Sequence, residues 1–173
     1  EAIKNCDLII GEEDKPVRRL LKSLNLVKKI DKLNEHSDKQ DIEFLTNECK
    51  ERSVVLISDA GTPGFCDPGF QLVDACRTAK VPVIPIPGAS SLMTILSMSS
   101  ERIDHFNFSG FLPREEEQRK RELARIVCSK TNEIFMDTPY RLTKLLEGLH
   151  AADKKKKYLI GVDMTKPNEE YRE

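Results

Sequence analysis

The sequence lacks tryptophan, and its five cysteines are scattered without any Cys-x-x-Cys pair. An odd, irregularly spaced set of cysteines argues against a disulfide framework and against a zinc site, so we expect no metal. There is also no signal peptide and no long apolar run, which predicts a cytoplasmic protein without a membrane span. The formal net charge is only −1, so RNA binding would have to come from local basic clusters.

Several catalytic signatures are missing as well. There is no Gly-x-Ser-x-Gly nucleophile elbow and no clear Cys–His pair, which argues against covalent nucleophilic catalysis. Neither Gly-x-x-x-x-Gly-Lys-Ser/Thr nor Gly-x-Gly-x-x-Gly occurs, so nothing indicates a binding site for a nucleoside triphosphate or a dinucleotide.

The chain of 173 residues is 33% charged and 39% hydrophobic, which is typical of a globular protein with a strongly solvated surface.

What the sequence does contain is organised around residues 53–70, which read Ser-Val-Val-Leu-Ile-Ser-Asp-Ala-Gly-Thr-Pro-Gly-Phe-Cys-Asp-Pro-Gly-Phe. The apolar, mostly β-branched run 54–57 predicts a short strand buried on both faces, as in a parallel sheet. Three glycines, two prolines and two aspartates follow, which predicts a long loop before a helix begins at Phe70. Ligands of open α/β sheets bind on loops at the carboxyl ends of strands, so this loop is the candidate site.

The loop also has suitable chemistry for a ligand. Its glycines let the backbone approach a bound molecule closely, and its prolines hold the loop in one shape. Asp59 and Asp67 accept hydrogen bonds and suit hydroxyls, amines or a cation, whereas they oppose a phosphate. The alternative is a rigid surface loop in which Asp67 caps the helix that follows.

Alternating strand and helix patterns run along the whole chain and predict an α/β fold. We expect strands at 7–11, 54–57, 81–86, 106–109, 133–136 and 158–162, and helices at 17–24, 38–51, 70–79, 92–98, 114–130 and 142–149. Strands 54–57 and 81–86 should be neighbours in the first sheet. Ser37 or Asp38 should cap the start of the helix at 38–51. The polar stretch 99–104 predicts a boundary between an N-terminal α/β domain, 1–100, and a C-terminal α/β domain, 101–173.

These motifs resemble the tetrapyrrole-methylase-like family of S-adenosylmethionine-dependent methyltransferases. The resemblance rests on Ser-Asp-Ala-Gly-Thr-Pro at 58–63 with Asp-Pro-Gly at 67–69, and on motifs at 85–91, 110–113, 138–141 and 165–166. It is closest to the branch that 2′-O-methylates cytidine in small-subunit ribosomal RNA. The family implies two α/β domains with the cofactor site in the cleft between them, and the second domain closes over substrate and cofactor. Its members usually have an earlier strand and loop before this sequence begins, and further strands after it.

The resemblance implies a site for S-adenosylmethionine. Its expected residues are Asp59, Ala60, Gly61, Thr62, Pro63, Asp67, Ser90, Ser91, Thr138, Pro139, Tyr140, Met164 and Thr165. Methyl transfer is an in-line displacement that needs orientation of donor and acceptor and exclusion of water, without a covalent nucleophile. A loop with carboxylates and no phosphate motif suits a cofactor made of adenosine and an amino acid.

The sequence allows several hypotheses for the methyl acceptor and for the residues that bind it. A ribose hydroxyl needs a base to take its proton, and Glu13, Asp14 and Asp137 are candidates, although each can instead cap a helix. Basic clusters predict contacts with ribosomal RNA or the small ribosomal subunit through Arg18, Arg19, Arg119 and Arg121, and relatives suggest a homodimer. The alternatives are a methyltransferase of the same family acting on a tetrapyrrole precursor or another small molecule, and a catalytically silent relative that binds the cofactor or RNA.

Overall fold

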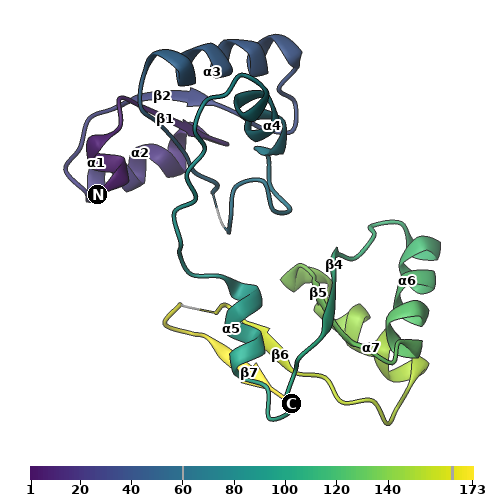
Figure 1. The fold of residues 1–173 in the computed structure, drawn as a ribbon. Helices are drawn as coiled ribbons and strands as arrows, with labels where there is room; N and C mark the ends of the chain where they lie inside the picture. The colour runs from purple at the N-terminus through teal and green to yellow at the C-terminus, as the bar shows by residue number, and fades with distance from the viewer. Residues whose placement is uncertain (60, 165) are drawn as a thin grey trace. The chain divides into compact units, whose positions relative to one another are not determined.

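Strand β1, Leu8–Gly11, is buried along its whole length and forms the centre of a parallel sheet. It pairs with β2, Lys29–Lys32, on one side and with β3, Val54–Leu56, on the other, giving the order β2-β1-β3. The computed structural model describes residues 1–59, 61–164 and 166–173. Contacts divide the chain into two compact units, 1–90 and 91–173, and each is described by itself (Figure 1).

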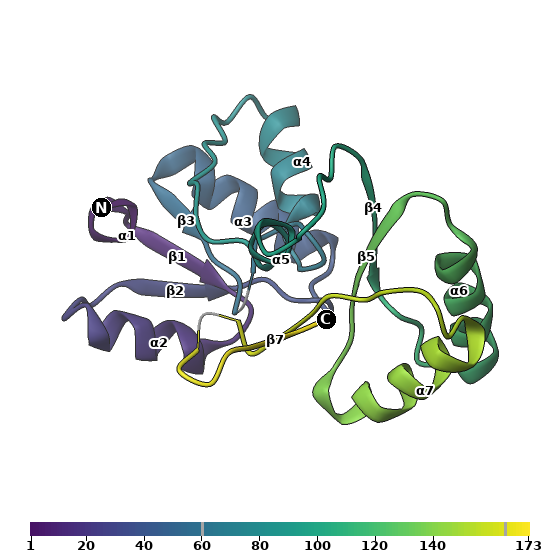
Figure 2. The same ribbon diagram turned by 90° about the horizontal axis from the view of Figure 1, so that it is seen from below.

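Helices cover both faces of the first sheet (Figure 2). They are α1, Ala2–Asn5; α2, Asp14–Ser23; α3, Lys39–Glu51; and α4, Phe70–Thr78. Side chains alternate along β1, so Leu8 and Ile10 pack on one face with residues of α3 and α4. Ile9 packs on the other face with Val17 and Leu21 of α2. Each face of the sheet therefore has its own apolar core, as expected for a doubly wound α/β unit.

The helix starts of this unit show which capping predictions hold. The carboxylate of Asp38 accepts hydrogen bonds from the backbone amides of Gln40, at 2.7 Å, and Asp41, at 3.0 Å. The Asp41 carboxylate accepts one from the Asp38 amide, at 3.0 Å, which completes a capping box and confirms Asp38 as the cap. Helix α4 instead begins after Gly69, with no side-chain cap. The alternative in which Asp67 caps this helix is therefore wrong.

The apolar stretch 81–86 does not form the predicted buried strand. The described residues pair no strand with the outer edge of β3, and Ile84 and Ile86 are 76% and 69% exposed. Pro82 and Pro85 lack an N–H group and cannot donate to a sheet ladder. Strand β3 itself is only half-buried, so the doubly buried strand is β1 rather than 54–57. The order of strands in the sheet decides which strand is buried on both faces, and hydrophobic periodicity does not encode that order.

The second unit contains a parallel pair of strands and a separate antiparallel pair. Its elements are α5, Ser91–Ser97; β4, Phe106–Phe111; α6, Glu116–Cys128; β5, Asn132–Met136; η1, Pro139–Arg141; α7, Leu142–Ala152; β6, Ile160–Val162; and β7, Glu170–Arg172. Strand β4 runs parallel to β5, and β6 runs antiparallel to β7. The core of this unit is formed by Leu112 together with buried residues of α6, Leu123 and Ile126, and of α7, Leu145 and Leu149.

The α/β class predicted from sequence is confirmed, with the remaining elements close to their expected positions. Two short strands, β2 and β7, are additional, because their sequences Lys-Ile-Asp-Lys and Glu-Tyr-Arg carry no apolar run. The contacts within the chain place α5 in the second unit, whereas the boundary predicted from sequence placed it in the first domain. The functional division into 1–100 and 101–173, and the inter-domain cofactor cleft, stay predictions.

The Gly-Phe-Leu-Pro motif at 110–113 forms an irregular end of β4. The pairing register with β5 shifts between Phe108 and Phe111, and Gly110 has a φ of 62°. A left-handed residue in a bulge favours glycine, which explains the residue type at this position. The bulge leaves Phe111 53% exposed while the next residue, Leu112, enters the core at 2% exposure.

A buried carboxylate joins both parallel strands of the second unit to α6. The Glu133 side chain is 2% exposed and accepts hydrogen bonds from Asn107, at 2.8 Å, and Ser109, at 3.2 Å. Its Oε1 also lies 3.3 Å from Nη1 of Arg125. Burial alone would raise the pKa of Glu133, but hydrogen bonds from Asn107, Ser129, Arg125 and Ser109 outweigh burial and lower the pKa to about 2.

We expect Glu133 to make the second unit sensitive to acid. A carboxyl whose pKa is lower in the folded state than in the unfolded state stabilises the fold at pH values above its unfolded pKa of 4.5. This stability is lost as the pH falls toward the folded pKa of about 2. At pH 7, Glu133→Gln should lower the free energy of unfolding by about 2–3 kcal/mol, allowing for the half-exposed Arg125. Urea unfolding measured at pH 7 and again in acid should show the gap to wild type closing. The exposed Glu147→Gln is the control, and an equal gap at both pH values would contradict the prediction.

None of the helices in the described residues has the length and apolar character that a bilayer span requires. The five cysteines are all free thiols, and Cys6 and Cys76 are buried. No group of three or more His, Cys, Asp or Glu side chains within the described ranges is arranged to hold a metal ion.

Candidate active site

Carboxylates gather where β1 and β3 end. Glu12 directly follows β1, and Asp59 and Asp67 lie on the loop after β3, so two parallel strands bring them to the same edge of the sheet. Burial raises the pKa of Glu12, and the charges of Asp67, Asp59 and Glu13 raise it further. Burial also raises the pKa of Asp67, partly opposed by a hydrogen bond from Ser58, and the charge of Asp59 adds to the rise. We call Glu12, Asp59 and Asp67 the acidic cluster.

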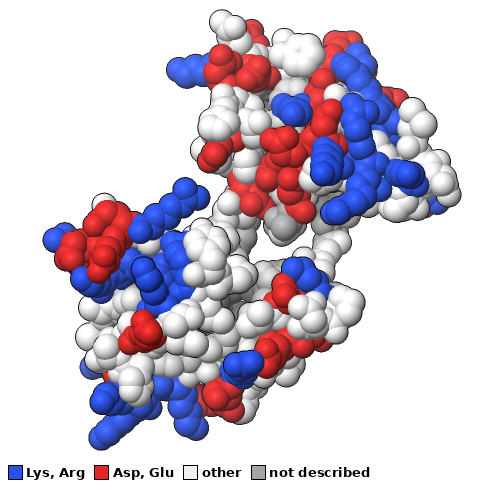
Figure 3. Space-filling view, turned by 180° about the vertical axis from the view of Figure 1, so that it is seen from behind, with Lys and Arg blue, Asp and Glu red and all other residues white. Residues whose placement is uncertain are grey.

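Figure 3 shows acidic side chains gathered on one face of the first unit, with basic side chains beside them. Nearby negative charge destabilises the charged forms of Glu12 and Asp67, and such arrangements concentrate at functional sites. The acidic cluster therefore favours a ligand that brings positive charge or hydrogen-bond donors to this edge.

Glu12 is a candidate site residue that the sequence prediction did not name. Its Oε1 is buried, and the part of the chain that the structure describes offers it no hydrogen-bond partner. Its two neighbours, which were candidate bases, are engaged differently. Glu13 faces solvent and lies 3.4 Å from Nζ of Lys32, while Asp14 begins α2 and lies 3.0 Å from Nη2 of Arg18. The run Glu-Glu-Asp marked the strand end, but the sequence does not reveal which carboxylate turns inward.

The loop that carries Asp59 and Asp67 is held by its own backbone. The amide of Phe65 donates to the carbonyl of Thr62 at 3.0 Å, and the amide of Gly64 donates to the carbonyl of Pro68 at 3.1 Å. Gly61 has a φ of 92°, and a Cβ placed on it would lie 3.3 Å from Oδ2 of Asp67. The loop is thus preorganised, and the space in front of the Asp67 carboxylate stays open only because residue 61 is glycine.

A cavity beside the cluster joins a predicted cofactor residue to a predicted RNA residue. It has a volume of about 400 Å³ and lies between α2 and the end of β3. Its lining is Pro16, Arg19, Leu20, Ser23, Ile57, Ser58 and Asp59. The structure therefore brings Arg19 and Asp59 to one site within the first unit, although forty residues of sequence separate them.

Asp137 and Arg119, predicted as a base and as an RNA contact, are instead buried against each other in the second unit. The Asp137 side chain is 5% exposed and forms ion pairs with Arg119 and with Arg141, whose Nε lies 2.9 Å from Oδ1. The backbone amide of Thr138 donates to the same oxygen at 2.8 Å. Both side chains are committed to each other in the interior of this unit, so the geometry favours a structural role for Asp137 and Arg119 over contact with a substrate. Arg121 remains exposed on α6.

The other predicted cofactor residues lie in several places. Ser90 ends the first unit, and Ser91 is the first residue of α5. Thr138 donates its backbone amide to Asp137, Pro139 begins η1, and Tyr140 is 80% exposed with its ring 5.7 Å from the Arg141 guanidinium. Met164 packs against Gly161, and Ala60 and Thr165 lie outside the described residues. Within the first unit, Asp59, Gly61, Thr62, Pro63 and Asp67 share the loop after β3.

We expect Glu12→Gln to stabilise the first unit and to weaken ligand binding. A carboxyl whose pKa is raised in the folded state destabilises the fold once the pH rises above the ordinary carboxyl pKa of 4.5. Glutamine has no charge to lose and removes that cost. A cationic ligand, in contrast, loses a charge-assisted hydrogen bond, which should raise its dissociation constant about tenfold or more. Urea unfolding and titration of S-adenosylmethionine at pH 7 measure the two effects. The exposed Glu51→Gln on α3 should change neither, and a destabilised Glu12→Gln would contradict the prediction.

The fold and this strand-end site define an α/β protein of the tetrapyrrole methylase type, and comparison with known proteins agrees. The family model for Tetrapyrrole (Corrin/Porphyrin) Methylases matches residues 1–173, so the chain belongs to this family. The solved structure of the methyltransferase CobJ has a TM-score of 0.61 over 99% of this chain and 76% of CobJ. Because the two sequences are only 14% identical, that likeness shows the fold alone.

Curated relatives share the name "Ribosomal RNA small subunit methyltransferase I". The protein from Haemophilus influenzae is 35% identical over 168 residues, which cover 96% of this chain and 59% of the relative. The one from Rickettsia prowazekii is 41% identical over 145 residues, covering 83% and 52%. A Borrelia garinii relative is 34% identical over 173 residues, covering 99% and 77%. The chain thus spans between half and four-fifths of the length of these relatives.

Proposed function

We propose that this chain provides the cofactor site of an S-adenosylmethionine-dependent methyltransferase that 2′-O-methylates a ribose in small-subunit ribosomal RNA. The observation that carries the proposal is the acidic cluster beside Gly61, whose carboxylates suit hydrogen-bond donors and cations and oppose a phosphate. Membership of the methylase family and the names of the relatives support it. We further propose a cytoplasmic homodimer that acts on the small ribosomal subunit or its RNA.

The hydrogen-bond acceptors of the first unit fit S-adenosylmethionine. The cofactor carries a sulfonium, an ammonium and ribose hydroxyl groups, all of which suit carboxylate acceptors. The buried Oε1 of Glu12 is an acceptor without a partner among the described residues, and Gly61 leaves room beside Asp67. We propose that Glu12, Asp59, Asp67 and the backbone from Ala60 to Pro63 hold the cofactor, joined by Ser90, Ser91, Thr138, Pro139, Tyr140, Met164 and Thr165. When bound, the cofactor supplies an electrophilic methyl group.

We favour Glu13 as the base. Glu13 and Asp14 each pair with a basic side chain at this strand end, but Glu13 is the more exposed carboxylate and its pair with Lys32, at 3.4 Å, is longer than the 3.0 Å pair of Asp14 with Arg18. Asp137, in contrast, is buried between two arginines. Taking the hydroxyl proton makes the ribose oxygen a better nucleophile toward the methyl group.

Two measurements on the full-length protein test the proposed function. Isothermal titration with S-adenosylmethionine tests the cofactor site, and methyl incorporation into small ribosomal subunits tests the acceptor. Glu13→Gln should keep the cofactor affinity and lower the turnover number, since general bases contribute about 10²–10⁴-fold. Cofactor binding without methylation of the subunits would favour the small-molecule acceptor or the silent relative, and absence of cofactor binding would refute the proposal.

For RNA binding we expect Arg18→Ala with Arg19→Ala to weaken the complex and to reduce its dependence on salt. Both side chains are exposed on α2, and Arg19 lines the cavity that reaches Asp59. For every phosphate that is no longer neutralised, the slope of log affinity against log salt should become shallower by about 0.7 for single strands. S-adenosylmethionine affinity should stay unchanged. Arg102→Ala, at an exposed pair with Asp104, is the matched control, and an unchanged salt slope in the double variant would contradict the prediction.

A further inference from the structure

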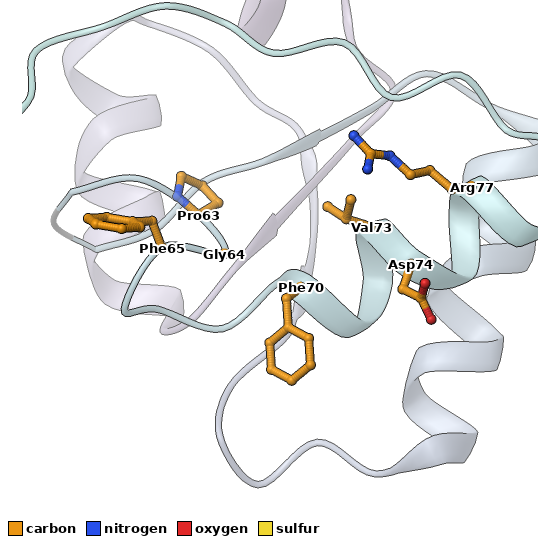
Figure 4. A pocket seen from close by; sticks show the side chains of 7 residues that line it. All are labelled: Pro63, Gly64, Phe65, Phe70, Val73, Asp74 and Arg77. Carbon is orange, nitrogen blue, oxygen red and sulfur yellow. The ribbon is translucent and has the colours of Figure 1, made fainter. Parts of the chain in front are cut away.

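A second cavity of about 400 Å³ lies between the loop after β3 and the outer face of α4 (Figure 4). Its lining is Pro63, Gly64, Phe65, Phe70, Val73, Asp74 and Arg77. The last four recur at helical spacing along one face of α4, whereas Leu72 and Cys76 lie on the opposite, buried face. Neither the acidic cluster nor the cofactor proposal uses these four residues.

Two aromatic rings border this cavity and remain accessible. Phe65 is 47% exposed and Phe70 is 63% exposed. A single exposed apolar residue needs no explanation, but two phenylalanines at one cavity make a local apolar surface that water solvates poorly. The backbone hydrogen bonds of the loop hold Phe65 in place, and Phe70 begins α4, so both rings start from ordered backbone.

Charged groups stand at the sides of the aromatic surface. In Figure 4, Phe70 and Asp74 point to one side of α4, and the guanidinium of Arg77 extends back along the helix over Val73. Asp74 and Arg77 form no ion pair, with each other or with any other described residue. A cation, a hydrogen-bond acceptor and two partly exposed rings therefore border one small cavity.

We propose that this cavity binds an unpaired RNA nucleotide, an inference that rests on the proposed function and deepens it. The base stacks on the exposed phenylalanine rings, Arg77 contacts its phosphate, and Asp74 accepts a hydrogen bond from an exocyclic amino group. RNA-binding proteins recognise single-stranded bases by this combination of stacking and basic contacts. Since Pro63, Gly64 and Phe65 belong to the same loop as Asp59 and Gly61, a base held here tethers the strand beside the proposed cofactor site.

The size of the surface favours a nucleotide over a second copy of the chain. A stable protein interface buries about 800 Å² on each partner, which is far more than seven residues around a cavity provide. Ligand sites typically have volumes of about 300–1,000 Å³, and a cavity of about 400 Å³ falls in that range.

Binding of a fluorescein-labelled, unstructured single-stranded RNA of about 12 nucleotides to the full-length protein tests this inference. Phe70→Ala should weaken binding about tenfold or more, because the base then has one stacking partner fewer, and Phe70→Trp should restore it. Arg77→Ala should weaken binding and make the salt slope shallower. Phe44→Ala removes a phenylalanine that is 52% exposed on α3 and is the matched control, with binding expected to be unchanged. The same strand annealed to its complement should bind more weakly than the single strand.

Several outcomes overturn the inference. One is single-strand binding by Phe70→Ala that equals wild type, and another is equal affinity for single strand and duplex. A third is a change in the monomer–dimer equilibrium of Phe70→Ala, measured by sedimentation, with RNA binding intact, which would make the surface an interface between copies. Titration of S-adenosylmethionine and methylation of small subunits by wild type judge the proposed function separately. A wild type that methylates subunits while Phe70→Ala binds RNA normally refutes this inference alone.

Discussion

Gly61→Val should abolish measurable binding of S-adenosylmethionine. Residue 61 has a φ of 92°, and its missing Cβ would lie 3.3 Å from Oδ2 of Asp67. A branched side chain there fills the space that a ligand needs to reach the Asp67 carboxylate. Overpacking of this kind, added to the removal of a charge-assisted hydrogen bond, should raise the dissociation constant on the order of a hundredfold or more. Isothermal titration measures the change.

The cost to folding should be much smaller than the cost to binding. A branched residue in the left-handed region costs about 1–3 kcal/mol, which a domain of ordinary stability tolerates. Gly64→Val is the matched control, because Gly64 has a φ of 77° in the same loop but a Cβ there would face the backbone of Gly69 and Phe70. It should retain far more cofactor affinity than Gly61→Val. Unchanged affinity in Gly61→Val would remove the loop from the site.

Asp137→Asn should destabilise the second unit by about 3–5 kcal/mol, the cost of leaving buried charges without their partner. Asp137 is 5% exposed, and it pairs with Arg119 and Arg141, which are 11% and 17% exposed. Nη1 of Arg119 already lacks a hydrogen-bond partner among the described residues, so removal of the carboxylate leaves this guanidinium poorly compensated. Urea unfolding at pH 7, followed by circular dichroism, measures the loss.

Two further variants separate structural and catalytic roles for Asp137. Asp104→Asn breaks an ion pair with Arg102 that is largely exposed, and it should cost no more than about 1 kcal/mol. Adding Arg119→Met to Asp137→Asn removes one of the stranded charges and should recover part of the stability. If Asp137→Asn unfolds at the same urea concentration as wild type but no longer transfers methyl groups, Asp137 is the base and the structural assignment is wrong.

The comparison of Arg119 with Arg19 shows where sequence reasoning about charge ends. Both lie in basic clusters on amphipathic helices, and both were predicted to contact RNA. Arg19 is exposed beside the acidic cluster, whereas Arg119 is buried against a carboxylate eighteen residues further along the chain. A cluster of like charges in sequence does not show which member has an opposite charge packed against it in three dimensions.

The sequence alone determined the α/β class, the position of most helices and strands, a cap at Ser37 or Asp38, and the loop that carries the candidate site. These features depend on local periodicity, turn residues and short-range hydrogen bonds, which neighbouring residues encode. Tertiary structure alone decided that β1 rather than 54–57 is doubly buried, that 81–86 pairs with no described strand, and that Glu12 turns inward. It also decided the pairing of Asp137 with Arg119 and the aromatic cavity on α4. Burial and ion pairing depend on which distant segments pack together, and that information appears only once the strands are ordered and the helices are docked on them.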